Sequence, residues 1–218
     1  MVFAARRAIS HSFFQRDPLL CARELIGTEL VWGRCAGIVV ETEAYLTEND
    51  EACHTFWRPS TRSFVERNKA GASYVYLNYG VHWMLNVLVK GAPRTGLILI
   101  RALEPTEGIE VMKRRRKVEE LKQLCSGPGK LTQALEITIR HHEVDLCAAP
   151  RRCFRARQAA HVAVVADARI GITRAAELPW RFTLRDSPFV SRPSKPPRSG
   201  ASPPSLIPAA VRKYESEP

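Results

Sequence analysis

Two glutamates and a tyrosine alternate in the segment VVETEAYL, residues 39–46. Because successive side chains of a β-strand point to opposite faces, we expect Glu41, Glu43 and Tyr45 on one face of a strand. If that face lines a cleft, a carboxylate on it can act as a general acid or base, or can stabilise a cation that develops during a reaction. A solvent-exposed edge strand would show the same alternation, so the segment alone leaves both interpretations open. The acids that follow it are predicted to be solvated loop residues: Glu48, Asp50 and Glu51.

A histidine and a group of aromatic residues come next along the chain. His54 alone is more typical of a structural histidine than of a catalyst, and no HxxxH pair accompanies it, so we predict no metal site. Aromatic residues in this number are typical of a core: Tyr74, Tyr76 and Trp83. Tyr79, however, precedes Gly80 in a predicted turn, where an exposed ring could stack on a nucleobase, an interaction worth ~1–3 kcal/mol.

The chain carries 33 Lys and Arg against 22 Asp and Glu, a net charge of +11. A surplus of this size favours a polyanionic partner, nucleic acid first and an anionic membrane surface second. The segment KRRRK, residues 113–117, is typical of a solvated helix face and could also contact phosphates. The segment SGPGK, residues 126–130, lacks the spacing of a nucleotide phosphate loop, but its backbone N–H groups could hold a DNA phosphate at the start of a helix.

A chain of 218 residues with 45% hydrophobic residues can bury one sizeable core, so we predict a single domain. The six cysteines form no CxxC pair, which is typical of free buried thiols in a reducing compartment. No apolar run approaches the ~18 residues that a membrane-spanning helix needs. These features favour an intracellular protein.

The acidic segment is expected to lie in a sheet that a helix precedes. Asp17 is a good helix cap, Pro18 suits the first turn and Gly27 suits the residue past the end, so residues 18–26 are predicted as a helix. The predicted strands are 28–32, 36–45, the two halves of 74–90 with a turn at Tyr79 and Gly80, 95–105 ended by Pro105, 161–166, 168–172 and 181–184. The other predicted elements are a long loop at 47–73, a helix at 106–124, a short helix within 125–137 and a disordered tail at 191–218, rich in Pro, Ser and Arg.

Six blocks occur in a fixed order along the chain: VVETEAYL, His54, YVYLNYGVHWMLNV, LIRALEPTEGIEVM, LCSGPGKLTQALEI and RIGITRAAELPWRF. From about Phe13 to Ser191 this series resembles the alkyladenine (3-methyladenine) DNA glycosylase family. The resemblance implies a mixed α/β (α+β) fold, a single domain at residues 11–190 in which a curved antiparallel β-sheet is flanked by helices. A DNA-intercalating β-hairpin would protrude from it, and residues 1–10 would form a flexible N-terminus.

The resemblance also implies an activity, that of a monofunctional DNA glycosylase of base excision repair. Such an enzyme flips a damaged purine out of the helix and hydrolyses its N-glycosidic bond, which leaves an abasic site. The implied bases are alkylated or deaminated purines: 3-methyladenine, hypoxanthine and ethenoadenine. No cofactor or metal is expected, the partner is double-stranded DNA that contains damaged purines, and no membrane is involved. The protein is expected to be a monomer, in the nucleoid-associated cytoplasm if bacterial and in the nucleus or an organelle if eukaryotic.

By the same resemblance, Glu43 activates the attacking water and Arg101 helps to position that water. The residues implied to bind the base are Tyr45, His54, Tyr76 and Asn86, the last by crowding the amino group of guanine. Glu41 is left with a structural or solvated role.

Three further residues are implied to contact the rest of the DNA. Tyr79 is the wedge that enters the duplex, and Lys130 and Arg62 lie near the DNA backbone. The loop at residues 60–72 departs from the family pattern, with Ser63 where an asparagine is usual, which leaves DNA contacts and substrate range there open. Two alternatives remain beside the enzyme: a catalytically silent DNA- or RNA-binding domain on the same scaffold, and a protein whose basic helix 106–124 docks an acidic partner.

Overall fold

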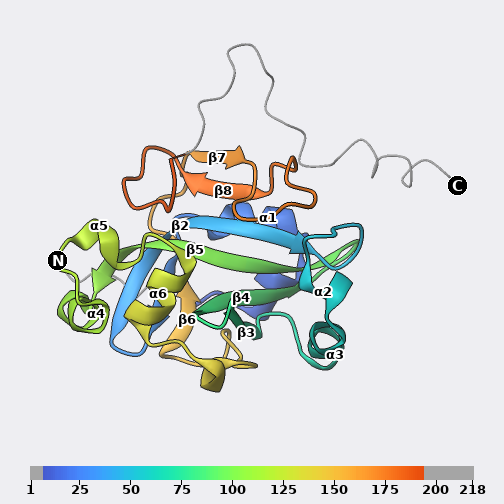
Figure 1. The fold of residues 1–218 in the computed structure, drawn as a ribbon, viewed down its shortest axis with the longest axis horizontal. Coiled ribbons are helices and arrows are strands. Elements are labelled where there is room, and N and C mark those ends of the chain that lie inside the picture. Colours follow the sequence, from blue (N-terminus) through green and yellow to red (C-terminus); the bar gives the residue numbers. More distant parts are fainter. Residues whose placement is uncertain (1–6, 194–218) are drawn as a thin grey trace, which may run out of the picture.

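The structure is a computed structural model that describes residues 7–193 of the chain. Its centre is a curved antiparallel sheet of eight strands (Figure 1). The main path through the sheet runs β3-β4-β5-β2-β1-β6, and β8 pairs with β2 and with β7. The strands are β1 Glu29–Trp32, β2 Cys35–Leu46, β3 Ser73–Asn78, β4 His82–Lys90, β5 Thr95–Glu107, β6 Arg152–Arg155, β7 Val164–Asp167 and β8 Arg181–Leu184.

Helices flank the sheet, which confirms the predicted single α+β domain. In Figure 1, α1 lies behind the sheet, α4, α5 and α6 gather at one end, and α2 and α3 lie at the other. The helices are η1 His11–Gln15, α1 Pro18–Leu25, α2 His54–Trp57, α3 Pro59–Arg67, α4 Ile109–Arg116, α5 Leu121–Leu124, α6 Pro128–Leu135 and η2 Ile139–His141, where η marks a 3₁₀-helix. No helix within residues 7–193 combines the length and the apolar character needed to cross a membrane.

Strand β2 occupies the middle of the sheet and carries the acidic segment. It has β5 along one edge, and β1 and then β8 along the other. Glu41 pairs with Ala102 of β5 and with Thr183 of β8, so this part of β2 has no free edge. The solvent-exposed edge that the alternation also allowed is therefore excluded: both Glu41 and Glu43 are fully buried.

The helix that precedes β1 forms as predicted. The Asp17 carboxylate accepts hydrogen bonds from the backbone N–H groups of Leu19 and Leu20, at 2.9 and 3.2 Å, and so satisfies two donors that a helix start leaves free. Gly27, just past the end, has φ of +84°, a conformation that glycine adopts without strain. The apolar face of α1 packs on β2, and the Thr42 hydroxyl of β2 donates to the Ala22 carbonyl at 2.9 Å.

The predicted loop at 47–73 is wrong in its middle, because α2 and α3 form there. Helix α3 buries only Thr61 and Phe64, too few residues for an apolar period to stand out in the sequence. The end predicted for β5 at Pro105 is also wrong, since the strand continues to Glu107. Pro105 is tolerated because it lies opposite Gly37 at a register shift between β2 and β5, where a ladder hydrogen bond is not required.

The single helix predicted at 106–124 is wrong as well. Residues 106–107 belong to β5, and α4 ends at Lys117, whose φ of 53° is left-handed and stops the helical ladder. The strand predicted at 168–172 is a loop, whereas the predictions near 161–166 and at 181–184 correspond to β7 and β8. Strand β6 was missed, because Arg152 and Arg155 frame only two apolar residues and give no alternation.

The two ends of the chain lie partly outside the described residues. Of the tail predicted at 191–218, only 191–193 are described, and of the flexible segment predicted at 1–10, only 7–10. Ile9 donates its backbone N–H to the Phe154 carbonyl at 2.8 Å, and Ser191 contacts Glu41 in the centre of the sheet. The flexibility and disorder predicted for these ends remain predictions.

We expect Asp17→Ala to lower the free energy of unfolding by roughly 1–3 kcal/mol, since it removes a helix cap and an ionic partner. Asp17 also accepts from Arg94 Nε at 2.7 Å, which ties α1 to the β4–β5 connection. Urea denaturation of the variant measures the change. Glu48→Ala, which alters an exposed loop carboxylate, is the control, and an equal effect of the two substitutions would contradict the capping role.

Candidate active site

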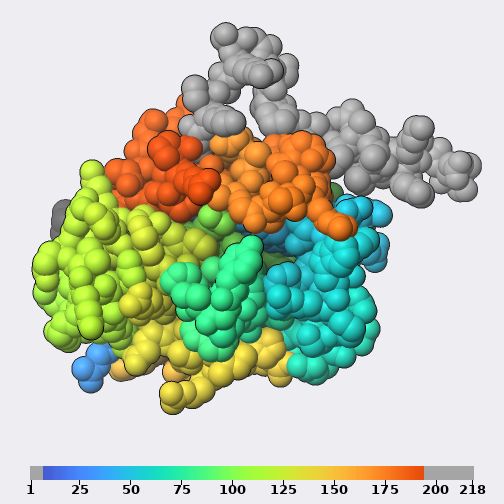
Figure 2. Space-filling model, viewed as in Figure 1, coloured from blue at the N-terminus to red at the C-terminus, as the bar shows by residue number. Residues whose placement is uncertain are grey.

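One cavity of about 400 Å³ opens between the β3–β4 hairpin, the α2 segment and the loop around residues 168–172 (Figure 2). Six of the nine site residues predicted from the sequence line it: Tyr45, His54, Tyr76, Tyr79, Asn86 and Arg101. They come from β2, α2, β3, the hairpin turn, β4 and β5, so the fold brings distant segments together here. The other lining residues are Ala52, Tyr74, Asn78, Met84, Leu97, Leu99, Pro128, Ile170, Gly171 and Ile172.

Aromatic rings form one wall of the cavity. The His54 ring lies 4.3 Å from the Tyr76 ring, centroid to centroid, at an interplanar angle of 62°. Behind them, the Tyr74 hydroxyl hydrogen-bonds with His54 Nδ1 at 3.2 Å and with the Thr61 hydroxyl at 2.8 Å. These bonds fix the orientation of His54, so the wall is held in place before any ligand arrives.

The wall is uncharged at neutral pH. Burial, and to a smaller extent the nearby Arg58 guanidinium, lower the pKa of His54 to about 4. Burial raises the pKa of Tyr76, and burial together with the Glu43 carboxylate raises the pKa of Tyr45. Both hydroxyls therefore keep their protons, and the cavity presents neutral π-faces to whatever enters it.

The Glu43 carboxylate lies directly behind this cavity, with a side chain that is 0% exposed. Its Oε2 accepts from the Tyr45 hydroxyl at 2.8 Å and from Arg101 Nη1 at 3.1 Å. Its Oε1 accepts from the backbone N–H of Ile170 at 2.7 Å. All three donors belong to lining residues, so the carboxylate touches the cavity wall from behind.

Arg101 joins the two buried glutamates. Its Nε donates to Glu41 at 3.0 Å while its Nη1 donates to Glu43. Burial opposes its charged form, but the carboxylates of Glu43 and Glu41 outweigh burial and raise the pKa of Arg101. The arginine is thus a permanent cation beside Glu43.

Glu41 has the structural role that the resemblance left open to it. It also accepts from Arg181 Nε at 2.7 Å and from the Ser191 backbone N–H at 2.6 Å. Arg181 itself is buried in β8. Sequence analysis named neither Arg181 nor Ser191 as a site residue, although Arg181 lies in the block RIGITRAAELPWRF, because their partner lies 140 or more residues away.

Asp50 is not a solvated loop residue, which corrects the prediction made for it. Its carboxylate is buried and forms a two-pronged ion pair with Arg169, at 2.6 and 2.8 Å. The Arg169 guanidinium also lies 4.6 Å from the centroid of the Tyr45 ring. Because Arg169 immediately precedes Ile170, this pair holds the loop whose N–H binds Glu43. Sequence analysis assigned Arg169 no role, although it opens the block RIGITRAAELPWRF.

Of the four predicted residues not yet described, two line the cavity and two do not: Asn86 and Tyr79, and Lys130 and Arg62. Asn86 is buried and donates from Nδ2 to the Tyr74 carbonyl at 3.2 Å. Tyr79 is 89% exposed at the mouth of the cavity, in a left-handed conformation with φ of 49°. Lys130 and Arg62 are not among the described residues that line the cavity. They bond to Ser126 Oγ at 3.3 Å and to the Thr55 carbonyl at 2.6 Å.

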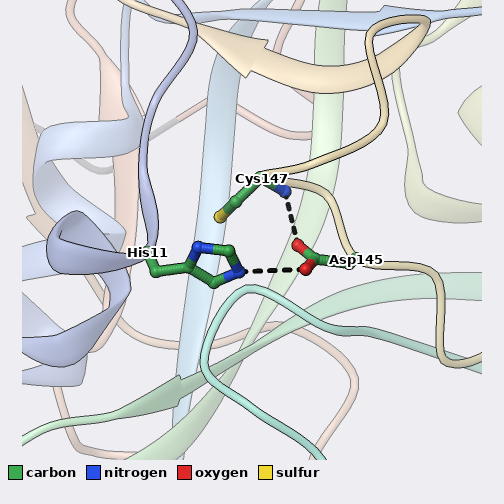
Figure 3. Close-up of side chains that lie close together, drawn as sticks. All are labelled: His11, Asp145 and Cys147. Atoms are coloured by element: carbon green, nitrogen blue, oxygen red, sulfur yellow. Dashed lines mark hydrogen bonds and ion pairs between the residues drawn. The ribbon is translucent and has the colours of Figure 1, made fainter.

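A separate cluster of possible metal ligands lies outside the cavity lining: His11, Asp145 and Cys147 (Figure 3). The donor atoms are already engaged with one another, since His11 Nε2 bonds to Asp145 at 3.0 Å and the Cys147 backbone N–H donates to Asp145 at 2.8 Å. Burial and the Asp145 charge raise the pKa of the Cys147 thiol to about 12. The two hydrogen bonds to Asp145 tie the N-terminal segment to the chain around residue 145.

Comparisons with known proteins agree with this geometry. The family model described as methylpurine-DNA glycosylase (MPG) matches residues 12–188. A relative from Rhodopseudomonas palustris, strain ATCC BAA-98 / CGA009, is 46% identical over 181 residues, which are 83% of this chain and 86% of that protein. A relative from Agrobacterium fabrum, strain C58, is 46% identical over 188 residues, 86% of this chain and 94% of that protein. Both carry the name "Putative 3-methyladenine DNA glycosylase".

The family model and these relatives define the class of protein. It is a DNA glycosylase, a hydrolase of N-glycosyl bonds in damaged DNA. The match extends over more than four fifths of the chain, and it includes every strand and helix that contributes to the cavity. The chain belongs to the methylpurine-DNA glycosylase family.

Replacement of Glu41 tests the buried charge network. We expect Glu41→Gln to lower the free energy of unfolding by roughly 3–5 kcal/mol, because Arg101 and Arg181 would lose a shared buried counter-charge. Chemical denaturation of the variant and the wild type measures this change in unfolding free energy. Glu24→Gln breaks a partly exposed pair with Arg16, 2.7 Å apart, and should cost no more than about 1 kcal/mol. A loss for Glu41→Gln no larger than this control would contradict the network.

The low pKa of His54 predicts a pH dependence of stability. Between about 4 and 6.5 the unfolded chain holds a proton on this histidine and the folded chain does not, so stability falls as pH falls through that window. Since the ring is partly exposed, we expect about 1–2 kcal/mol from this group. Comparing unfolding free energies of the wild type and His54→Gln across pH 4–7 isolates it. If the unfolding free energies of the two proteins changed in parallel with pH, the lowered pKa of His54 would be refuted.

Proposed function

We propose that this enzyme excises alkylated or deaminated purines from double-stranded DNA: 3-methyladenine, hypoxanthine and ethenoadenine. It would act on a nucleotide turned out of the helix, hydrolyse the N-glycosidic bond and leave an abasic site. The observation that carries the proposal is a fully buried carboxylate, Glu43, behind an aromatic cavity of a volume typical of small-molecule sites.

Glu43 is suited to activate water. A carboxylate offers about four acceptor sites, and Tyr45, Arg101 and Ile170 fill three of them, which leaves capacity for one water. Arg101 donates to the same carboxylate and would help to orient that water. As the bond to the base breaks, positive charge moves onto the deoxyribose, and the same anion would face this oxocarbenium-like centre.

The neutral aromatic wall explains a preference for damaged purines. An alkylated purine can be cationic, and a cation over the faces of Tyr45 and Tyr76 gains ~0.5–2 kcal/mol that a normal purine does not. A neutral His54 beside them adds no repulsive charge. A cationic base is also a good leaving group, so it needs no proton from the protein. Asn86 would exclude guanine by crowding its amino group.

The remaining roles concern the duplex. Extruding a nucleotide costs a few kcal/mol of stacking and pairing, and Tyr79 at the mouth of the cavity would offset part of it by filling the vacated space. Lys130 and Arg62 would contact phosphates, in keeping with the net charge of +11. A monomeric state and a location wherever the cell keeps its DNA belong to the same proposal.

Excision from a defined duplex tests the chemistry. The protein is incubated in EDTA with a duplex that contains one hypoxanthine or ethenoadenine, and alkali then cleaves the abasic sites. We expect release by the wild type and a loss of at least ~100-fold in rate for Glu43→Gln, because general-base catalysis is removed while the cavity keeps its shape. Affinity for the same duplex should be retained.

Glu48→Gln, in an exposed position on the loop after β2, is the matched control and should keep the wild-type rate. Undiminished turnover by Glu43→Gln would refute its role as the base. Binding without release at any lesion of a panel, by the wild type itself, would instead favour the catalytically silent DNA- or RNA-binding domain.

A further inference from the structure

Three aromatic side chains are exposed within residues 7–193, and all three lie at or beside the cavity. Tyr79 lines its mouth. Phe56 and Trp57, at 50% and 51% exposure, follow the lining residue His54 on α2. Because residues three apart are neighbours on a helix surface, Trp57 lies beside His54 at the rim. Large exposed apolar groups that gather at one place mark a surface that something covers.

Phe56 and Trp57 form a rigid pair. Their ring centroids are 4.9 Å apart at an interplanar angle of 58°. The Trp57 indole N–H donates to the Glu51 carbonyl at 2.7 Å, and the Arg174 guanidinium lies 4.1 Å from the centroid of the Trp57 ring. A surface whose side chains are already ordered loses little entropy when a partner binds.

The charges around the pair favour a polyanion. Arg58 and Arg62 are exposed on the same segment, and Arg174 comes from the loop that also lines the cavity. The nearest acid, Glu51, is already paired with Arg174 at 3.1 Å, and Glu48 is exposed farther back in the same loop. Aromatic faces interleaved with arginines are suited to bases and phosphates, because each ring can stack on a base while each guanidinium meets a phosphate.

We propose that Phe56 and Trp57 form a second DNA contact, a platform on which the nucleotide next to the extruded one rests. The β3–β4 hairpin, which carries Tyr79, and the α2 segment, which carries the platform, would then hold the strand on two sides of the cavity entrance (Figure 2). The proposal rests on the function proposed above, since it assumes that the cavity receives one extruded nucleotide. It assigns the platform to affinity and positioning, with no part in bond cleavage.

The test separates binding from chemistry. Phe56→Ala, Trp57→Ala and the double variant are compared with Ile139→Ala, which trims an exposed apolar residue (54%) on η2 outside the cavity lining. We expect the double variant to bind a lesion duplex about 10-fold more weakly, as lost base stacking would give. The single-turnover rate at saturating protein should stay at the wild-type value. Ile139→Ala should change neither quantity.

Tryptophan fluorescence gives a readout that a merely structural role would not move. DNA should quench the wild type more than Trp57→Phe, because stacking on a base quenches only the indole that it contacts. Phe56→Ala, in which an exposed ring is trimmed, keeps the test valid should the double variant fail to fold. The platform would be overturned if every variant kept the DNA affinity and the fluorescence quenching of the wild type. It would also be overturned if the variants lost binding to anionic phospholipid vesicles while their DNA affinity stayed the same. Base release by the wild type separately reports on the proposed function.

Discussion

Two carboxylates are buried side by side in the centre of a β-sheet, and the rest of the site depends on how their charge is balanced. A buried carboxylate without a partner costs several kcal/mol. Glu41 and Glu43 avoid that cost because Arg101 spans both and Arg181 meets Glu41 from β8. The sheet therefore holds a compact set of two anions and two cations, and its geometry fixes the one carboxylate that adjoins the cavity.

The same arrangement couples the wall of the cavity to the Glu43 carboxylate. Tyr45 presents its ring to the cavity and its hydroxyl to Glu43, so one side chain belongs to both the wall and the carboxylate. The loop after β7 is held to this centre by the buried pair of Asp50 and Arg169, and it returns the N–H of Ile170 to Glu43. A shift of any of these segments would move the carboxylate relative to the cavity.

Local chemistry in the sequence predicted much of the fold. The cap at Asp17, the glycine after α1 and the hairpin turn at Tyr79 depend on neighbours within a few residues, and all three form as expected. Errors arose where few residues are buried, as in α3, or where a backbone conformation interrupts a helical pattern, as at Lys117.

The site was predictable where its residues lie in recognisable blocks, and six of them do line one cavity. The ionic partners Arg169 and Arg181 also lie in one of these blocks, RIGITRAAELPWRF, but the block does not reveal which residues they contact. Arg169 and Arg181 are 119 and 140 residues from Asp50 and Glu41, and alternation along a strand carries no information about a partner at that distance. Asp50 looked like a loop acid for the same reason: its burial is decided by an arginine far along the chain.

The order in which these partners occur along the chain has a consequence for biosynthesis. Glu41 and Glu43 leave the ribosome well before Ile170, Arg181 and Ser191, which contact them in the folded protein. Until then the central strand lacks one of its two cationic partners, Arg181, and its β8 neighbour. The set of contacts around Glu41 and Glu43 is therefore complete only after residue 191 has been added to the growing polypeptide.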